Sequence, residues 1–242
     1  MGAAYPTPPK LLFFGDPHGD FTSVIQAVEA LQPQAVILLG DMQATRPLHV
    51  ELAPIISTDI WFIPGNHDTD SELFYDNLWG STLGNKNLHG RVAQIAGYNV
   101  AGLGGVFRNS IWNPELSIEK AAFPSPQALL RHMKRTERWR DGISLRHRSS
   151  VFPSDFTYLS NQRADILVTH EGLASAAFGQ PVLNDLARSL GANLVVHGHL
   201  HQDIDYEAQG LLPAGSNYKV FGVNQGSYLR WPPERPAKES GR

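Results

Sequence analysis

The sequence predicts a layered α/β fold, first because short aliphatic runs alternate with amphipathic segments of helical length. Second, five of these runs end in loops rich in His, Asp and Asn. The five loops lie at residues 15–18, 40–41, 65–68, 169–171 and 197–201. Short runs of branched and aliphatic residues are typical of buried parallel strands. Because functional groups gather beyond the carboxyl ends of such strands, the five loops indicate one shared site.

The first half of the chain alternates expected strands with expected helices. The strands are expected at 11–15, 35–39 and 60–63, and the helices at 20–31, 47–53 and 70–79. The apolar residues of the first helix share one face, and Asp20 or Thr22 can cap its start. Apolar and polar residues then alternate over 91–103 around Gly97, which predicts an antiparallel hairpin.

The second half contains two further strand–helix units and a set of short strands. Strands are expected at 165–169 and 193–197, helices across 172–190, and short strands near 203–206, 210–213, 218–223 and 227–231. This order favours right-handed, largely parallel connections with antiparallel additions. We expect the whole chain, 1–242, to form one domain with flexible tails at 1–9 and 232–242, which are rich in Pro and polar residues.

Residues 107–164 interrupt this alternation. They carry ten basic and five acidic side chains, a net charge of +5, so the remainder of this −3 chain carries −8. A helix is expected over 126–140, with Leu129, Met133 and Trp139 among its apolar positions. Long insertions of this kind often act as lids or recognition elements. The structural alternative is a solvated helical face with extended Arg side chains.

The composition is that of a globular protein, with 42% hydrophobic residues among 242 and no cysteine. Without cysteine there are no disulfides, thiolate metal sites or cysteine nucleophiles. Any metal must be held by His, Asp and Asn, which favours Mn, Fe or Zn. No apolar stretch reaches the roughly 18 residues that a membrane span needs. The first ten residues lack the apolar core of a secretory signal, so a cytoplasmic protein without membrane contact is expected.

Read in order, the polar loops contain D-x-H at 16–18, G-D at 40–41, G-N-H-D at 65–68, a lone His170 and G-H-x-H at 198–201. This ordered set resembles the signature of the calcineurin-like metallophosphoesterase superfamily, over residues 12–201. The resemblance implies an αββα sandwich of the metallophosphoesterase type, with mixed sheets and ligand-bearing loops at the strand C-termini. It also implies a metal-dependent phosphoesterase with two divalent metal ions, Mn, Fe or Zn.

The resemblance implies a role for each motif residue. The first metal would be held by Asp16, His18 and His201. The second would be held by Asn66, His170 and His199, with Asp41 bridging both ions. A hydroxide between the metals would attack phosphorus in line, while His67 assists the leaving oxygen. The glycines at positions 40, 65 and 198 suit turns that bring the backbone close to the metals.

The segment GDPHGDF resembles the opening of the serine/threonine phosphatase branch of this superfamily. Two departures separate the chain from that branch. That branch continues its second block as GDxVDRG, but Ala44 and Thr45 replace its acid and its arginine here. Arg46 comes one position late, and the third block ends in Asp68 where that branch usually has Glu. These differences argue against a protein phosphatase of that branch.

Two further residues are candidates for the chemistry. Asp68 is expected to orient the catalytic His67, with Asp20 and Asp70 as alternatives that remain open. Arg108, which follows the glycine-rich AGLGGVF, is a candidate phosphate contact, because a guanidinium matches phosphate oxygens with two parallel hydrogen bonds.

The leading hypothesis is hydrolysis of phosphate esters, with a phosphorylated small molecule, a nucleotide or a phosphoprotein as substrate. One alternative is a phosphodiesterase or nuclease that holds nucleic acid through residues 107–164. Another is a non-catalytic binding scaffold of the same fold. An α/β-hydrolase is excluded because no G-x-S-x-G follows a strand, and a P-loop NTPase because G-x-x-x-x-G-K-[ST] is missing. The preference for monoesters or diesters and the oligomeric state stay open.

Overall fold

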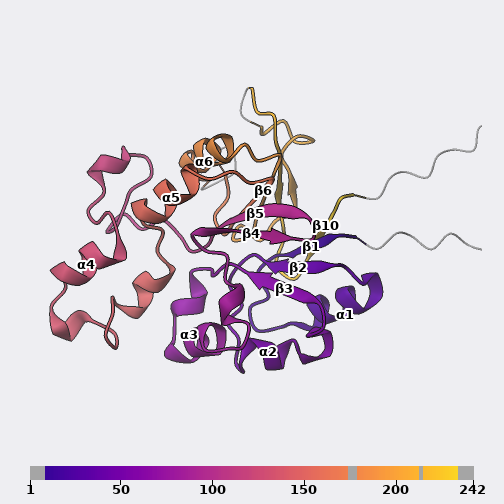
Figure 1. Ribbon diagram of the computed structural model, residues 1–242, viewed down its shortest axis with the longest axis horizontal. Coiled ribbons are helices and arrows are strands. Elements are labelled where there is room, and N and C mark those ends of the chain that lie inside the picture. Colours follow the sequence, from indigo (N-terminus) through magenta and orange to yellow (C-terminus); the bar gives the residue numbers. More distant parts are fainter. Residues whose placement is uncertain (1–8, 174–178, 213–214, 234–242) are drawn as a thin grey trace, which may run out of the picture.

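Two mixed β-sheets stacked between layers of helices make up the computed structural model, which describes residues 9–173, 179–212 and 215–233 (Figure 1). Most of the two predicted tails, at 1–8 and 234–242, lies outside the described residues. Pro9, which we expected in the flexible N-terminal tail, is buried, and its carbonyl accepts a hydrogen bond of 3.4 Å from the Gln34 N–H. The predicted tail boundary is therefore wrong at Pro9, which packs on the fold.

The first sheet has the order β10-β1-β2-β3. Its strands are β1 (Leu11–Phe14), β2 (Ala35–Leu38), β3 (Asp59–Phe62) and β10 (Tyr228–Trp231). Strands β1, β2 and β3 are parallel, whereas β10 pairs antiparallel with β1. Helices α1 (Thr22–Leu31), α2 (Leu48–Glu51) and α3 (Glu72–Trp79) cover the outer face of this sheet (Figure 1). Because the three strands run the same way, the loops that follow them meet at one edge.

The second sheet has the order β4-β5-β6-β7-β9-β8. Its strands are β4 (Arg91–Ile95), β5 (Tyr98–Leu103), β6 (Ile166–Thr169), β7 (Leu194–His197), β8 (Ile204–Asp205) and β9 (Lys219–Gly222). The central strands β5, β6, β7 and β9 are parallel, and β4 and β8 are antiparallel edges. Helices α5 (Pro153–Ser160) and α6 (Val182–Leu190) cover the outer face (Figure 1). The predicted hairpin over 91–103 is confirmed as β4 and β5.

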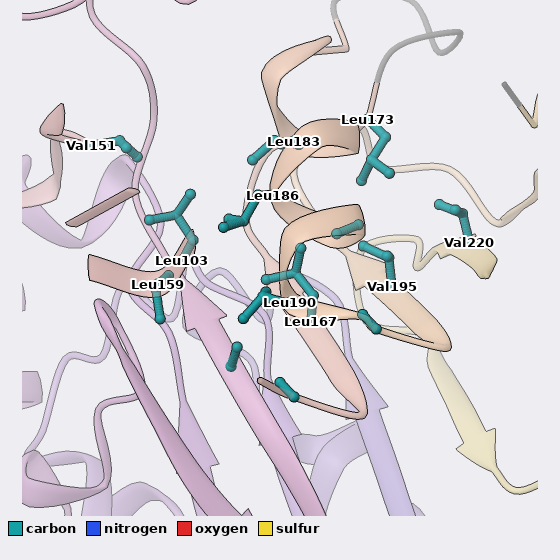
Figure 2. Close-up of a cluster of buried hydrophobic side chains, with 14 of the residues drawn as sticks. Leu103, Val151, Leu159, Leu167, Leu173, Leu183, Leu186, Leu190, Val195 and Val220 are labelled. Atoms are coloured by element: carbon teal, nitrogen blue, oxygen red, sulfur yellow. The ribbon is translucent and has the colours of Figure 1, made fainter. Parts of the chain in front are cut away.

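Clusters of buried apolar side chains join the layers. In β1, Leu11 and Phe13 pack between the two sheets, whereas Leu12 and Phe14 pack under the first layer of helices. Both faces of the strand are therefore buried, which explains its uninterrupted apolar sequence. A third cluster fills the space between the second sheet and helices α5 and α6 (Figure 2). This order of layers confirms the predicted αββα sandwich.

Residues 107–164, here called the interrupting segment, contain less helix than the sequence predicts. The expected helix over 126–140 is wrong in length, because α4 spans only Pro126–His132 and Met133 is already extended. The Arg138 guanidinium donates hydrogen bonds to the carbonyls of Leu130 and Met133 and so closes the C-terminal end of α4. A short 3₁₀ turn, Arg135–Glu137, follows.

Two other predicted elements differ from the structure. No strand forms at the described residues 210–212, where one was expected near 210–213; a turn spans residues 206–210, and the Leu211 N–H closes it on the Tyr206 carbonyl at 2.7 Å. Only the second part of the helical stretch expected across 172–190 is observed, as α6, and residues 174–178 lie outside the described residues. Among the described residues, no helix is long and apolar enough to cross a membrane.

The interrupting segment is attached to α3 by aromatic and ionic contacts. Tyr75 stacks on Trp79 at 4.3 Å between ring centroids and meets Trp139 edge-on at 4.8 Å. Arg140 lies over the Trp139 ring at 4.1 Å and donates two hydrogen bonds to the carboxylate of Asp76. Trp139 thus packs against another helix and does not continue α4. The part that carries α4 projects beyond α3 and α5 at one end of the molecule (Figure 1).

Candidate metal centre

The polar loops that follow β1, β2, β3, β6 and β7 converge, and the seven side chains predicted as metal ligands form two adjoining groups. The first group contains Asp16, His18 and His201. The second group contains Asp41, Asn66, His170 and His199. Five loops that are distant in the sequence therefore supply one cluster, as the strand order predicts.

In the first group, the Nε2 atoms of His18 and His201 lie 3.0 Å apart. The His201 Nε2 is also 3.5 Å from the Asp16 carboxylate. The Nδ1–H of His18 donates a hydrogen bond of 2.6 Å to Oε1 of Gln43, so its Nε2 keeps a lone pair directed at His201. Two imidazole lone pairs and a carboxylate thus face a common point.

In the second group, the Asp41 carboxylate and the rings of His170 and His199 offer ligand atoms that all lie within 4.8 Å of one another. The His170 Nδ1–H donates to the Leu39 carbonyl at 2.8 Å, so its Nε2 carries the lone pair. That Nε2 lies 3.2 Å from Oδ1 of Asn66 and 3.4 Å from Oδ2 of Asp41. Acceptor atoms again face one another.

This arrangement of acceptors fits a pair of divalent cations. Oδ1 of Asp16 is buried and has no hydrogen-bond partner among the described residues, which is costly unless a cation compensates it. Burial opposes protonation of His170, but the charges of Asp41 and Asp16 outweigh it and raise the pKa of His170 to about 10. The pocket therefore draws positive charge, either as a proton on His170 or as a cation. Neutral imidazoles, carboxylates and an amide oxygen suit Mn, Fe or Zn.

Backbone strain is concentrated in the same loops. Positive φ angles occur at five of the seven predicted ligands, namely Asp16, His18, Asp41, His199 and His201. Residues other than glycine rarely adopt this conformation, and it costs about 1–3 kcal/mol at each position. Such strain persists where surrounding structure enforces it, often at functional sites. It lets these short loops turn their side chains back toward the common cluster.

The three glycines singled out from the sequence lie directly against ligand side chains, and a Cβ atom added at Gly198 would come within 2.6 Å of the Asp16 carboxylate. A Cβ atom added at Gly40 would overlap the His170 ring, and Gly40 also has a φ of +115°. A Cβ at Gly65 would overlap the carboxylate and the backbone of Asp41. Only glycine therefore allows these loops to approach so closely.

Replacing Gly65 with Ala should weaken metal binding about 10- to 100-fold, the effect typical of disturbing the groups that support a metal ligand. The added methyl group must displace Asp41, which lies in contact with it. Titration of the metal-free protein with Mn²⁺ measures this, with thermal unfolding as the check that the fold survives. An unchanged dissociation constant in a folded variant would contradict the placement of Asp41.

The imidazole of His67 lies beside the cluster and makes a hydrogen bond to an acid that is not a predicted metal ligand. Its Nδ1–H donates a hydrogen bond of 2.6 Å to Asp70, and its ring centroid is 5.8 Å from that of His18. Partial burial opposes protonation of His67, but the hydrogen bond to Asp70 and the charge of Asp41 raise its pKa above the ordinary value. The backbone N–H of His67 donates to Asp41 at 2.8 Å. Within the described residues, its Nε2 makes no hydrogen bond.

Asp70, rather than Asp68, is the acid that meets the His67 imidazole. Asp68 is buried and accepts hydrogen bonds from the backbone N–H groups of Gly65 at 2.8 Å and Gln43 at 2.9 Å. Burial and the charge of Asp41 raise the pKa of Asp68 to about 7. Asp20, the third acid considered, accepts from the Thr22 N–H at the start of α1. The role that Asp68 can fill is to tie two ligand loops together.

Arg108 is half-buried at the edge of the cluster. The charges of Asp70 and Glu171 both act on its guanidinium. Asp70 accepts a hydrogen bond from His67, and Glu171 directly follows the predicted ligand His170. The guanidinium is fixed by hydroxyl groups, with Nε donating to Oγ of Ser150 at 3.1 Å. This placement is compatible with the predicted contact to phosphate.

Three supporting residues were not identified from the sequence. Gln43 fixes the His18 ring, and its only sequence signal is its position two residues after Asp41. Glu171 accepts a hydrogen bond of 3.0 Å from the Phe107 N–H, and burial raises its pKa to about 7. Tyr206 bonds Nε2 of the buried His197 at 2.9 Å. These contacts join segments far apart in the chain, so local patterns do not reveal them.

The fold and the cluster together define an α/β sandwich with a His- and Asp-rich candidate metal centre. A family model of calcineurin-like phosphoesterases matches residues 9–203. The chain therefore belongs to the calcineurin-like phosphoesterase family, which confirms the resemblance seen in the sequence.

One relative and two solved structures are similar to this chain. An uncharacterized protein of Haemophilus influenzae is 42% identical over 227 residues, which cover 90% of this chain and 96% of that protein. A crystal structure described as a dimetal phosphatase from Danio rerio is 12% identical, with a TM-score of 0.51, covering 92% of this chain and 89% of that chain. Another crystal structure, 11% identical, has a TM-score of 0.52 and covers 90% and 91%. At these identities the solved structures show the fold alone.

Proposed function

We propose that this protein hydrolyses phosphate esters at a centre of two divalent cations, Mn, Fe or Zn. The observation that carries the proposal is the convergence of seven predicted ligands whose acceptor atoms face one another. The first cation is assigned to Asp16, His18 and His201, and the second to Asn66, His170 and His199, with Asp41 between them. Membership of a phosphoesterase family supports the same reaction class.

Bound divalent cations supply two effects, which are neutralising phosphate charge and lowering the pKa of the water that attacks phosphorus. The chain's own residues do the rest. His67 donates a proton from Nε2 to the leaving oxygen, while Asp70 accepts its Nδ1–H and fixes the ring. Arg108 holds a non-reacting phosphate oxygen at the edge of the cluster. Asp68 holds the loops of Gly65 and Gln43 together by accepting hydrogen bonds from their backbone N–H groups.

Two other functions compete with this one. A phosphodiesterase or nuclease would use the basic charge of residues 107–164 to hold its substrate. A non-catalytic scaffold of the same fold would not need an intact catalytic histidine. His67 is present and fixed by Asp70, and this favours an enzyme.

Turnover of two chromogenic esters tests the proposal. The protein loaded with Mn²⁺ should hydrolyse p-nitrophenyl phosphate, bis-p-nitrophenyl phosphate or both, and a chelator should abolish the activity. Inertness toward both esters with Mn²⁺, Fe²⁺ and Zn²⁺ would contradict the proposed function. A nuclease would bind single-stranded DNA with an affinity that falls steeply as salt rises, and a flat salt dependence would remove that alternative.

A further inference from the structure

The hydrogen bonds that hold the Arg108 guanidinium all go to neutral groups. Besides the bond from Nε to Ser150, its Nη2 donates to Oγ of Ser149 at 3.3 Å and to the Arg146 carbonyl at 3.5 Å. Within the described residues, no carboxylate lies at ion-pair distance from Arg108, and its Nη1 makes no hydrogen bond. An ordered guanidinium with one free amino group is suited to bind an anion.

The segment that holds Arg108 is tied to the catalytic loop. Oγ of Ser149 lies 2.7 Å from Oγ1 of Thr69, which belongs to the 3₁₀ turn that begins at His67. The turn Leu145–Ser149 packs against that same turn. On the other side, the Phe107 N–H donates a hydrogen bond to the carboxylate of Glu171, the residue after His170. Arg108 is therefore fixed relative to the two loops that carry Asn66 and His170, both members of the second group of predicted ligands.

A second arginine stands beside the first. The side chain of Arg146 is exposed and, within the described part of the chain, makes no hydrogen bond or ion pair, while its carbonyl accepts from Arg108. Burial and the positive charge of Arg146 together lower the pKa of Arg108. Burial and the charges of Arg108 and Arg146 likewise lower the pKa of the adjacent His147. Like charges held this close repel each other, and an anion between them relieves the repulsion.

We propose that Arg108 and Arg146 form an anion subsite that selects substrates with a terminal, dianionic phosphate group, so the substrate class is phosphate monoesters. The inference rests on the proposed function and decides between the monoester and diester alternatives. In the second motif block, Thr45 stands where the serine/threonine phosphatase branch has its phosphate-binding arginine. The interrupting segment instead places Arg108 next to the loops of Asn66 and His170. A diester carries one negative charge fewer, and a substituent occupies one of the oxygens that the arginines would bind.

The test compares kcat/KM for p-nitrophenyl phosphate and its bis ester in three variants, Arg108→Gln, Arg146→Gln and the control Arg131→Gln. Losing a hydrogen bond between charged groups should lower the monoester value about 10- to 100-fold for Arg108→Gln and about 10-fold for Arg146→Gln. The diester value should change less than about threefold, because it engages the pair weakly. Arg131 is exposed on α4 and, among the described residues, makes no hydrogen bond or ion pair, so Arg131→Gln should match the wild type.

Binding of inorganic phosphate to the Mn²⁺-loaded protein, measured by calorimetry, supplies a second readout that needs no turnover. Arg146→Gln should weaken phosphate binding about tenfold, and because Arg146 is exposed this variant should fold normally. Equal losses on both esters, or phosphate affinity equal to that of Arg131→Gln, would overturn the inference. If the wild type hydrolysed neither ester, the proposed function would fail, and the phosphate affinities of the variants would still decide whether the arginine pair binds a dianion.

Discussion

Replacing Asp41 with Asn should strip the protein of bound metal and lower turnover about 10³-fold or more, because cations at such centres contribute several kcal/mol of transition-state stabilisation. Asp41 is a buried member of the second group of predicted ligands and faces His170 across 3.4 Å. Asparagine keeps the shape and keeps an oxygen to accept the His67 backbone N–H, which Asp41 accepts at 2.8 Å. The substitution therefore removes the negative charge while preserving the loop.

Metal content by atomic absorption and kcat for the better ester are the measurements. Asp185→Asn is the matched control, because Asp185 is an exposed residue of α6 that pairs with Arg188. The control should keep both metal and activity. If Asp41→Asn retained the full metal content of the wild type, a charge bridging the two cations would not be needed and the assignment of Asp41 would be wrong.

Replacing His67 with Ala should leave the metal content unchanged and lower kcat about 10²- to 10⁴-fold, the range for loss of a general acid. The imidazole of His67 donates a hydrogen bond to Asp70, which is not a predicted metal ligand. Only the backbone N–H of His67 is hydrogen-bonded to Asp41. Alanine keeps that backbone contact. The two substitutions therefore separate metal binding from proton transfer.

The leaving group offers a further check on His67. An ester with a poor leaving group, such as a simple alkyl phosphate, needs protonation more than p-nitrophenyl phosphate does, so it should lose more activity in His67→Ala. His132→Ala, at an exposed position of α4, is the control and should behave as the wild type does. Loss of metal in His67→Ala, or undiminished hydrolysis of the alkyl ester, would show that His67 does not act as the acid.

Much of the fold was predictable because the buried strands have uninterrupted apolar sequences. Strands β1, β2, β6 and β7 are buried at every residue, so their runs stand out against the polar loops. The predicted helix over 126–140 failed because its apolar positions serve different partners. Leu129 packs into the core cluster, whereas Trp139 packs on Tyr75 of α3. Periodicity alone does not distinguish these two environments.

The candidate site was predictable to the extent that its residues end strands. The strand order brings the seven predicted ligands together, whereas the assignment of each ligand to one of two cations stays a prediction. The choice of Asp70 as the partner of His67 was not predictable, since Asp68 and Asp20 are acids of the same type and spacing does not show which of the three reaches the ring. The positive φ angles and the Gln43 contact to His18 also depend on tertiary structure. The spacing of residues in the sequence does not predict these angles or this contact.

The central claim is that these loops hold two cations at one centre, and anomalous X-ray diffraction from crystals grown with Mn²⁺ tests it most directly. We predict two manganese peaks in each molecule, both enclosed by the seven side chains and adjoining Asp41. Crystals of Asp41→Asn grown in the same way should lose at least one of them. An absence of peaks at saturating Mn²⁺, or peaks bound by other residues, would contradict the account.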